Sequence, residues 1–471
     1  MGNKIRNFLI FAIGIIVGAF GTAMAQKQPS NLPVEELRQL SDVFGMIKSD
    51  YVEPIDDRKL LKEAIAGMVS SLDPHSSYLD KQELKELKEG TSGKFGGLGM
   101  EVGMEDGLVK VISPIEDTPA YKAGIRPGDL ITKLDSAPVK GMTLTQAVKK
   151  MRGDPGTKIT LTISRKGVLR PIVLTLTRAM ITVRSVKSKM IEPGYIWLRI
   201  VQFQDPTVED LAKHIKKHYD KNPNIKGIVL DLRNDPGGVL PGAIGVAAAF
   251  LPKEALVVST NGQLAESKAE FYARPEYYST RIGQDPLVKL PAAIKKVPIV
   301  VLINAGSASA SEIVAGALQD HKRATIMGSQ SFGKGSVQTV RQLTEETGLK
   351  LTTARYYTPS GKSIQAKGIV PDLLVDETAK GNGINDLRIR EADLDKHLSN
   401  DGEVKSKDMD AEDENKLLET MKNYKPIEYG TAKDFQLTQA LNHLKGKPVK
   451  LSKTQKKKKD DDKTEAGENK K

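Results

Sequence analysis

One segment carries the clearest fold signal: residues 298–318 read PIVVLI, then NAGSASAS, then EIVAGAL. The first six residues form the short, continuous apolar run that is typical of a buried strand, and the last seven suit a helix. A second run, Gly227 to Leu232, also precedes a Gly-rich turn. From Ile181 onward such strands alternate with helical segments, which predicts an α/β core.

The remaining chain divides by composition into further regions. Residues 32–89 place apolar side chains at helical spacing, which predicts a helical N-terminal region. Residues 90–178 change to Gly-rich turns and strand-like runs, with one expected helix at Leu144 to Met151. The α/β core is expected at 179–375. It is followed by a polar, helical region at 376–445 that ends in an amphipathic stretch from Phe435 to Leu444, and by a disordered Lys-rich tail at 446–471.

Composition excludes several classes of site. The chain has 471 residues, of which 39% are hydrophobic, enough for two or three domains with ordinary cores. Much of the net charge of +12 could come from the tail, where Lys456 to Lys459 run together, so nucleic acid is not an expected partner. There is no cysteine, which excludes a thiol nucleophile, disulfides and a thiolate zinc site. We expect no cofactor.

The first 25 residues have the pattern of an export signal. Lys4 and Arg6 precede an apolar run from Phe8 to Phe20, and Ala23-Met24-Ala25 suits signal cleavage. The run is shorter than the roughly 20 residues of a membrane span, although flanking residues could extend it into an uncleaved anchor. In either case we expect the bulk of the chain to be periplasmic or otherwise extracytoplasmic. Membrane association, at the inner membrane, would involve only this segment.

The small residues between the strand and the helix of 298–318 form a turn that can present a hydroxyl. Free backbone N–H groups at a helix N-terminus favour the negative charge of an acyl-transfer intermediate, so a serine here could act as a nucleophile. Serine is also a preferred N-cap residue, and Ser307, Ser309 and Ser311 could merely cap the helix. Local sequence does not choose among the three.

A glycine-framed lysine follows in the loop from Gly328 to Gly335. This loop has some likeness to a phosphate-binding loop, which needs Ser or Thr after its lysine to hold Mg²⁺. Gly335 occupies that position after Lys334, and an exported protein would meet little nucleoside triphosphate. A nucleotide-dependent enzyme is therefore disfavoured.

Together these segments resemble a known protease family. Gly306 to Ile313, Gln319-Asp320, Phe332 to Gly335 and Gln338 are similar to the catalytic block of the carboxyl-terminal processing proteases. The resemblance implies a crotonase-like protease fold in which Ser309 is the nucleophile, Lys334 the general base, and Gln338 the residue that orients the lysine amine. A lysine of ordinary pKa, about 10.4, is protonated at neutral pH, so burial has to lower the pKa of Lys334.

A second block, Leu230 to Gly238, also resembles this family. The resemblance implies that a backbone N–H from Gly237 or Gly238 joins that of Ala310 to form the oxyanion hole, and it leaves open which glycine contributes. Asp231 and Arg233 are expected to hold the loop by charged hydrogen bonds.

Residues 96–131, with the helix from Leu144, resemble a PDZ domain. The resemblance implies that the loop Gly96-Gly97-Leu98-Gly99 binds a peptide carboxylate through backbone N–H groups, and that the peptide adds as a strand. Leu98, Met100 and Val148 are the candidates for the apolar pocket. Arg165 is similar to the family arginine that couples peptide binding to catalysis. The alternative is a β-rich spacer without a ligand.

Histidine is not required by this chemistry. The chain has six, and we interpret His214 and His218, four positions apart, as a solvated helix face rather than a metal pair. His321 is expected to be structural. No metal site is predicted.

The sequence therefore predicts a serine endopeptidase that recognises exposed, apolar C-termini of extracytoplasmic proteins and cleaves through an acyl-enzyme. The alternative is a catalytically inactive PDZ scaffold that only binds peptides. The sequence does not decide whether an adaptor protein takes part. We expect a homo-oligomer, with the helical N-terminal region and the stretch from Phe435 to Leu444 as the candidate dimerisation elements.

Overall fold

The computed structural model describes residues 33–115, 117–279, 283–379, 381, 389–400 and 427–452. By its internal contacts the chain divides into two compact units, Met1–Met68 and Val69–Lys471. The predicted signal or anchor at residues 1–25 and the lysines at 456–459 lie outside the described residues.

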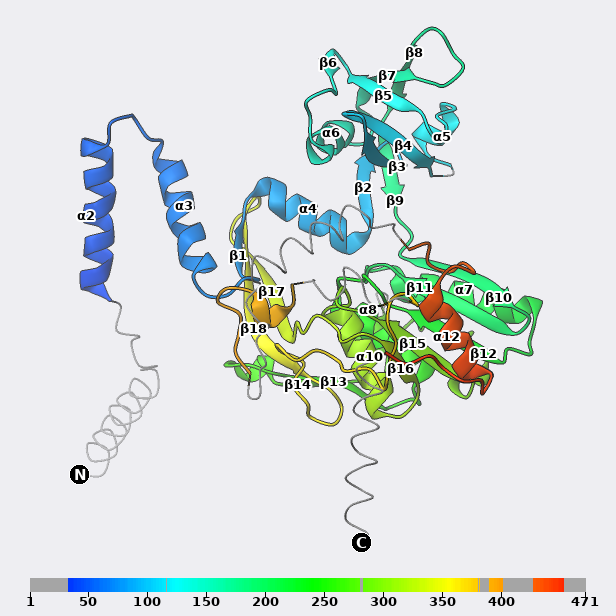
Figure 1. Ribbon diagram of the computed structural model, residues 1–471. Coiled ribbons are helices and arrows are strands. Elements are labelled where there is room, and N and C mark those ends of the chain that lie inside the picture. Colours follow the sequence, from blue (N-terminus) through cyan, green and yellow to red (C-terminus); the bar gives the residue numbers. More distant parts are fainter. Residues whose placement is uncertain are drawn as a thin grey trace, which may run out of the picture. The chain divides into compact units, whose positions relative to one another are not determined.

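The first unit is helical, as its apolar spacing predicts. Its helices are α2 (Val34–Asp50) and α3 (Asp57–Ser70), drawn in blue in Figure 1. No residue of α2 is buried. Within the described ranges, none of the helices is both long and apolar enough to cross a membrane.

A six-stranded sheet forms the centre of the second unit, in the order β10-β11-β12-β15-β16-β19. The strands from β11 to β19 are parallel, and β10 pairs antiparallel with β11. Their bounds are β10 (Val186–Glu192), β11 (Tyr195–Ile200), β12 (Gly227–Asp231), β15 (Ile299–Ile303), β16 (Thr325–Gly328) and β19 (Leu373–Leu374). The apolar runs that predicted the α/β core are β12 and β15, and every residue of both is buried.

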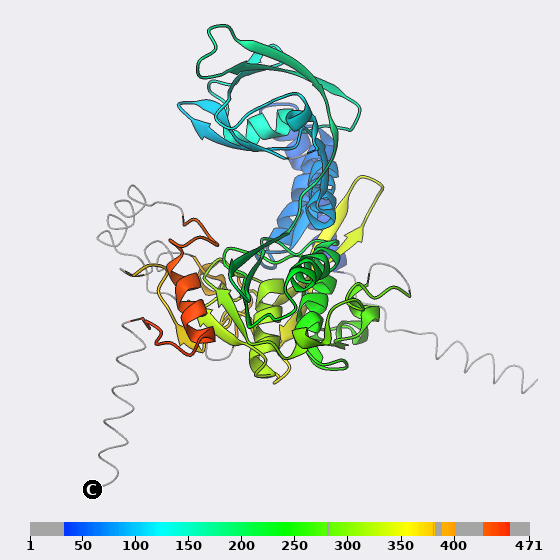
Figure 2. The same ribbon diagram turned by 90° about the vertical axis from the view of Figure 1, so that its right-hand side faces the viewer.

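Helices cover both faces of this sheet (Figure 1, Figure 2). One face packs against α7 (Thr207–Lys221), α8 (Leu240–Phe250) and α10 (Ala310–Asp320), and the other against α12 (Phe435–Leu444). Alternate residues of each strand point to opposite faces, so Val301 belongs to the first cluster and Val300 and Leu302 to the second. The parallel strands end at one edge, where the loops after β12 and β15 meet.

A second, antiparallel sheet lies beside the first. Its order is β1-β18-β13-β14, with β17 also paired to β18. The bounds are β1 (Ser77–Leu79), β13 (Leu256–Asn261), β14 (Ala269–Tyr272), β17 (Ser336–Gln342) and β18 (Gly348–Tyr357). Strand β1 falls inside the region predicted to be helical, because its three residues pair with β18, more than 260 positions later. It is followed by α4 (Lys81–Ser92).

The β-rich domain has a hydrophobic core of its own. Its sheet has the order β3-β4-β5-β7-β8, with β6 at the side. The bounds are β3 (Met100–Glu105), β4 (Leu108–Pro114), α5 (Pro119–Lys122), β5 (Leu130–Leu134), β6 (Ala137–Pro138), α6 (Leu144–Met151), β7 (Lys158–Ser164) and β8 (Ile172–Thr177). The predicted helix at Leu144 to Met151 is confirmed as α6. The strands β2 (Lys94–Gly97) and β9 (Ala179–Thr182) pair with each other where the chain enters and leaves this domain.

Short helices complete the second unit: η1 (Ala265–Ser267), α9 (Pro275–Tyr278), η2 (Ala292–Lys295) and η4 (Glu391–Asp393). The described part of 376–445 contains less helix than predicted, only η4 and α12. Side-chain contacts to the core hold the η4 segment in place, since the buried Glu391 carboxylate accepts a hydrogen bond from the Gln365 amide and contacts His75. The amphipathic stretch from Phe435 to Leu444 is confirmed as α12.

The prediction that His214 and His218 lie on a solvated face of α7 is wrong. His218 is buried, at 9% exposed, and both His214 Nδ1 and His218 Nε2 contact the Ser188 hydroxyl, at 2.6 and 2.9 Å. The helix places its i and i+4 side chains against β10 rather than toward water. Burial lowers the pKa of both imidazoles.

Candidate active site

Ser309 occupies a strained turn between β15 and α10. It is the N-cap of α10, with φ of 53° and ψ of −111°. A positive φ is costly for a residue with a Cβ, and such strain is concentrated at functional sites, at about 1–3 kcal/mol each. The turn places the Ser309 side chain at the N-terminal end of the helix, where free N–H groups gather.

The hydroxyls of the other two serines, Ser307 and Ser311, are held in structural hydrogen bonds. The Ser307 hydroxyl donates to the Leu232 carbonyl at 2.8 Å, and the Ser311 hydroxyl donates to the Asp235 carbonyl at 3.0 Å. Both side chains are fully buried, whereas Ser309 is 7% exposed. The geometry therefore favours Ser309 among the three candidates.

The buried Glu312 carboxylate joins the serine turn to the lysine loop. Its Oε2 accepts the backbone N–H of Ser309 at 2.8 Å and that of Lys334 at 3.0 Å. Its Oε1 accepts the N–H of Gly333 at 2.7 Å and the hydroxyl of Ser331 at 2.5 Å. Burial raises the pKa of Glu312 to about 7, and these hydrogen bonds oppose the rise. Four donors surround the two oxygens, so the anion is the form that fits this site.

Lys334 lies in the loop between β16 and β17. Burial is the largest cause of its lowered pKa, and the positive charge of Lys350 adds to it. The carboxylates of Glu391, Glu312 and Asp73 act in the opposite direction. Among the described residues, no hydrogen bond joins the Lys334 amine to the Ser309 hydroxyl. The Ser309 side chain instead shares a hydrogen bond with the buried Tyr356, whose pKa burial raises to about 12.

Gln338 lies on β17, close to a group of hydroxyls. Its amide Nε2 donates to the Ser336 hydroxyl at 3.0 Å and to the Thr352 hydroxyl at 3.2 Å. Thr352 in turn donates to the Asp73 carboxylate at 3.0 Å. No contact from Gln338 to the Lys334 amine occurs in the part of the chain that the structure describes, and the orienting role of Gln338 stays a prediction.

The two glycines of the turn after β12 are not equivalent. The Gly237 N–H donates to Asp235 Oδ1 at 2.9 Å, whereas the described structure offers no acceptor to the N–H of Gly238 or Ala310. A Cβ on Gly237 would come within 2.9 Å of the Ala310 nitrogen, so this turn and the start of α10 are close neighbours. Gly238 is thus the better candidate for the second oxyanion donor.

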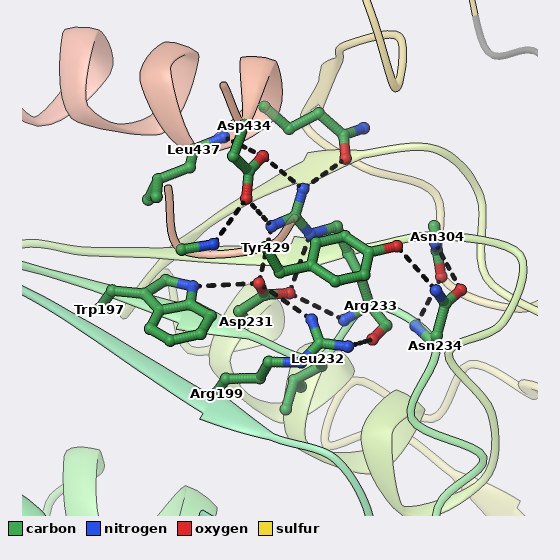
Figure 3. Close-up of polar contacts among 12 residues, drawn as sticks. Trp197, Arg199, Asp231, Leu232, Arg233, Asn234, Asn304, Tyr429, Asp434 and Leu437 are labelled. Carbon is green, nitrogen blue, oxygen red and sulfur yellow. Dashed lines mark hydrogen bonds and ion pairs between the residues drawn. The ribbon is translucent and has the colours of Figure 1, made fainter. Parts of the chain in front are cut away.

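Buried charges hold this turn in place (Figure 3). The Arg233 guanidinium donates to both oxygens of Asp231 and to both oxygens of Asp434, and all three side chains are fully buried. The expected role of Asp231 and Arg233 in holding the loop is confirmed. Asp434, at the N-cap of α12, was not anticipated, because it lies 201 positions after Arg233.

The candidate peptide-binding residues lie together in the β-rich domain. Gly96 and Gly97 belong to β2 and pair with β9, which leaves Leu98 and Gly99 as the turn before β3. Leu98, Met100 and Val148 belong to one apolar cluster, and their role as a peptide pocket stays a prediction. Strand β3 is at the edge of its sheet, so it has a side on which a further strand could add.

Arg165 forms an ion pair inside the same domain. Its guanidinium binds both oxygens of Asp129, at 2.7 and 2.8 Å, and donates to the Gly124 carbonyl. Its coupling role stays a prediction. Among the described residues, no three His, Asp or Glu side chains are grouped so as to hold a metal ion.

Of the side chains at this site, the sequence reasoning missed Glu312, Tyr356 and Asp434. Glu312 had a local signal, since Ser309 and Glu312 have the Ser-x-x-Glu spacing of a capping box. Tyr356 and Asp434 had none, because their contacts at the site depend on distant parts of the chain.

Comparisons with known proteins cover most of the chain. Sequence profiles match residues 19–83 (activating protease CtpB N-terminal domain), 96–176 (PDZ domain) and 194–375 (peptidase family S41). A carboxy-terminal-processing protease of Bartonella bacilliformis is 47% identical over 401 residues, 84% of this chain and 88% of that protein. A probable CtpA-like serine protease of Staphylococcus aureus is 38% identical over 352 residues, 74% of this chain and 66% of that protein. The solved photosystem II D1 C-terminal processing protease is 30% identical, and the match covers 72% of this chain and 86% of that one, with a TM-score of 0.41.

Proposed function

The chain belongs to the carboxy-terminal-processing serine proteases of peptidase family S41, and on this premise we propose that it cleaves proteins through an acyl-enzyme on Ser309, with Lys334 as general base. The observation that carries the proposal is the strained turn at Ser309. Of the three serine hydroxyls in this turn, only that of Ser309 donates no hydrogen bond to a backbone carbonyl among the described residues.

The proton of the Ser309 hydroxyl passes to the neutral amine of Lys334 as the oxygen attacks the scissile carbonyl. The lysine then returns a proton to the leaving amine, and water releases the acyl group by the same route. Burial favours the neutral amine that this step needs, since it lowers the pKa of Lys334. Gln338 would orient the amine once its amide leaves the Ser336 and Thr352 hydroxyls.

The N–H groups of Ala310 and Gly238 would bind the oxyanion. Both amides lack an acceptor among the described residues, and Ala310 begins helix α10, whose dipole favours negative charge. In related chemistry, removing one such donor costs about 2.7–4 kcal/mol of transition-state stabilisation.

The PDZ domain would select the substrate. A free C-terminal carboxylate would bind the N–H groups of the turn at Leu98 and Gly99, while an apolar last side chain enters the pocket of Leu98, Met100 and Val148. We propose that the substrates are extracytoplasmic proteins with exposed apolar C-termini. The proposal includes export through residues 1–25 into the periplasm, with cleavage or anchoring of that segment.

Degradation of casein, a loosely folded protein, tests the proposal. We expect Ser309→Ala and Lys334→Ala to abolish cleavage without a change in melting temperature, and Gln338→Ala to reduce it less. Lys213→Met, on the exposed side of α7, is the control and should keep full activity. Wild-type turnover in Lys334→Ala would exclude the Ser/Lys mechanism, and an inactive wild type would favour the peptide-binding scaffold.

A further inference from the structure

The C-terminal segment of residues 427–452 lies outside the residues 194–375 that match the peptidase profile. It nevertheless belongs to the catalytic core. Leu437, Ala440 and Leu441 of α12 pack in the same cluster as Val229 of β12 and Leu302 of β15. The segment is therefore attached to the two strands that lead into the turn with Gly237 and Gly238, here called the oxyanion turn, and into the serine turn at Ser309.

Tyr429 reaches from this segment to the oxyanion turn (Figure 3). Its hydroxyl accepts a hydrogen bond from the Asn234 side-chain amide at 2.7 Å. Asn234 has a φ of 56°, in the left-handed region that asparagine adopts more readily than most residues. The hydroxyl of Tyr429 holds the Asn234 side chain just before Asp235, whose carboxylate and carbonyl accept hydrogen bonds from the Gly237 N–H and the Ser311 hydroxyl.

Asn234 transmits this contact to the serine turn. Its backbone N–H donates to Asn304 Oδ1 at 2.9 Å, and the Asn304 amide donates back to Asn234 Oδ1 at 2.9 Å. Asn304 Oδ1 also accepts the N–H of Gly306 at 3.0 Å, in the turn that leads to Ser309. A short chain of hydrogen bonds thus runs from Tyr429 through both turns.

The aromatic ring of Tyr429 is fixed independently of its hydroxyl. The guanidinium carbon of Arg199 lies 4.1 Å from the ring centroid, and that of Arg233 lies 4.5 Å from it. These contacts survive loss of the hydroxyl, so Tyr429→Phe removes one hydrogen bond and leaves the ring held by two cations.

We propose that Tyr429 is a positioning residue for proteolysis, which holds Asn234 and, through it, the turns that carry Gly238, Ala310 and Ser309. This inference rests on the proposed roles of those three residues. It makes the segment from Ile427 a part of the active site, so a chain without that segment would lack a properly held oxyanion turn.

The rate at which a fluorophosphonate probe labels the nucleophilic serine measures this positioning. The probe is small and contains no peptide, so its reaction does not depend on recognition by the PDZ domain. The nucleophilic serine oxygen bonds to phosphorus, fluoride leaves, and the hydroxyl proton passes to the base, while the phosphoryl oxygen occupies the oxyanion site. We expect Tyr429→Phe to lower the labelling rate and kcat about 5- to 10-fold, the value of one ordinary hydrogen bond, with KM unchanged. Tyr219→Phe is the matched control, because the buried Tyr219 hydroxyl has no hydrogen-bond partner in the described structure, and it should label at the wild-type rate.

A double-mutant cycle separates positioning from a general effect on stability. If Tyr429 acts through Asn234, Tyr429→Phe should cost nothing further in an Asn234→Ala background. Additive losses would overturn the inference, as would wild-type labelling of Tyr429→Phe, or a loss that only follows the unfolded fraction in thermal melts. Failure of the wild type to label at Ser309 would instead overturn the proposed function.

Discussion

The backbone N–H groups of Ser309 and Lys334 donate to the same atom, Oε2 of Glu312, at 2.8 and 3.0 Å. One rigid carboxylate therefore sets the separation of the serine turn and the lysine loop before substrate arrives. Preorganisation of this kind lowers the reorganisation that the reaction needs, since the reacting groups are held by the fold.

Replacing Glu312 by glutamine tests this bridge. The amide would place an N–H₂ group where one carboxylate oxygen accepts, so at least one backbone N–H loses its acceptor, and two do if the N–H₂ group takes the place of Oε2. We expect kcat to fall by about 100-fold with a smaller change in KM, because hydrogen bonds to a charged group are worth about 1.5–3 kcal/mol. Steady-state kinetics with a fluorogenic peptide measure the changes in kcat and KM separately. An increase in KM at constant kcat would contradict a positioning role.

The pH dependence of cleavage tests the state of Lys334. Its pKa is lowered in the folded protein, and the neutral amine is active, so kcat/KM should rise with pH and level off below the usual pKa of lysine. Lys350→Met removes a positive charge that lowers the pKa of Lys334, whereas Glu391, Glu312 and Asp73 remain. The midpoint should therefore move to higher pH in this variant. Lys213→Met serves as the control, and a midpoint that stays in place or moves downward in Lys350→Met would contradict the assignment.

Two forms of one substrate test recognition by the PDZ domain. A chain ending in an apolar residue with a free carboxylate should be cleaved faster than the same chain amidated, because the amide lacks the charge that the turn at Leu98 and Gly99 would bind. Competition kinetics with both substrates give the ratio of kcat/KM. Equal rates would exclude carboxylate recognition.

The same two substrates can be used to test whether Arg165 couples peptide binding to catalysis. If this residue couples binding to catalysis, Arg165→Ala should slow turnover while peptide affinity for the PDZ domain, measured by fluorescence polarisation, is unchanged. The bidentate pair with Asp129 gives the competing expectation, a less stable PDZ domain. Asp129→Asn separates the two, since it weakens the pair and keeps the arginine.

Asp434 should matter for stability far more than its place near the C-terminus suggests. Asp434→Ala leaves the buried Arg233 with one carboxylate partner fewer, and breaking a buried pair costs about 3–5 kcal/mol. Asp220→Ala breaks the exposed Lys216–Asp220 pair and should cost at most about 0.5 kcal/mol. Urea unfolding of both variants gives the comparison. A loss below about 1 kcal/mol in Asp434→Ala would contradict a structural role for this buried pair.

The sequence alone was enough to predict the α/β core and the β-rich domain. Such features are local: the apolar runs of β12 and β15 and the periodicity of α6 and α12 are visible in short windows, because strands and helices repeat every two or 3.6 residues. Ser309 and Lys334 came forward as candidates through the resemblance of their motifs to the carboxyl-terminal processing proteases.

Tertiary structure decided how the candidate groups are held. It committed the Ser307 and Ser311 hydroxyls to backbone carbonyls, tied the Gly237 N–H to Asp235, and placed Tyr429 on Asn234, 195 positions away. It also turned His218 into the core, where the sequence had suggested water. A hydrogen bond extends only about 3 Å, so its partners depend on which loops the fold brings together, and no periodicity in the sequence encodes that meeting.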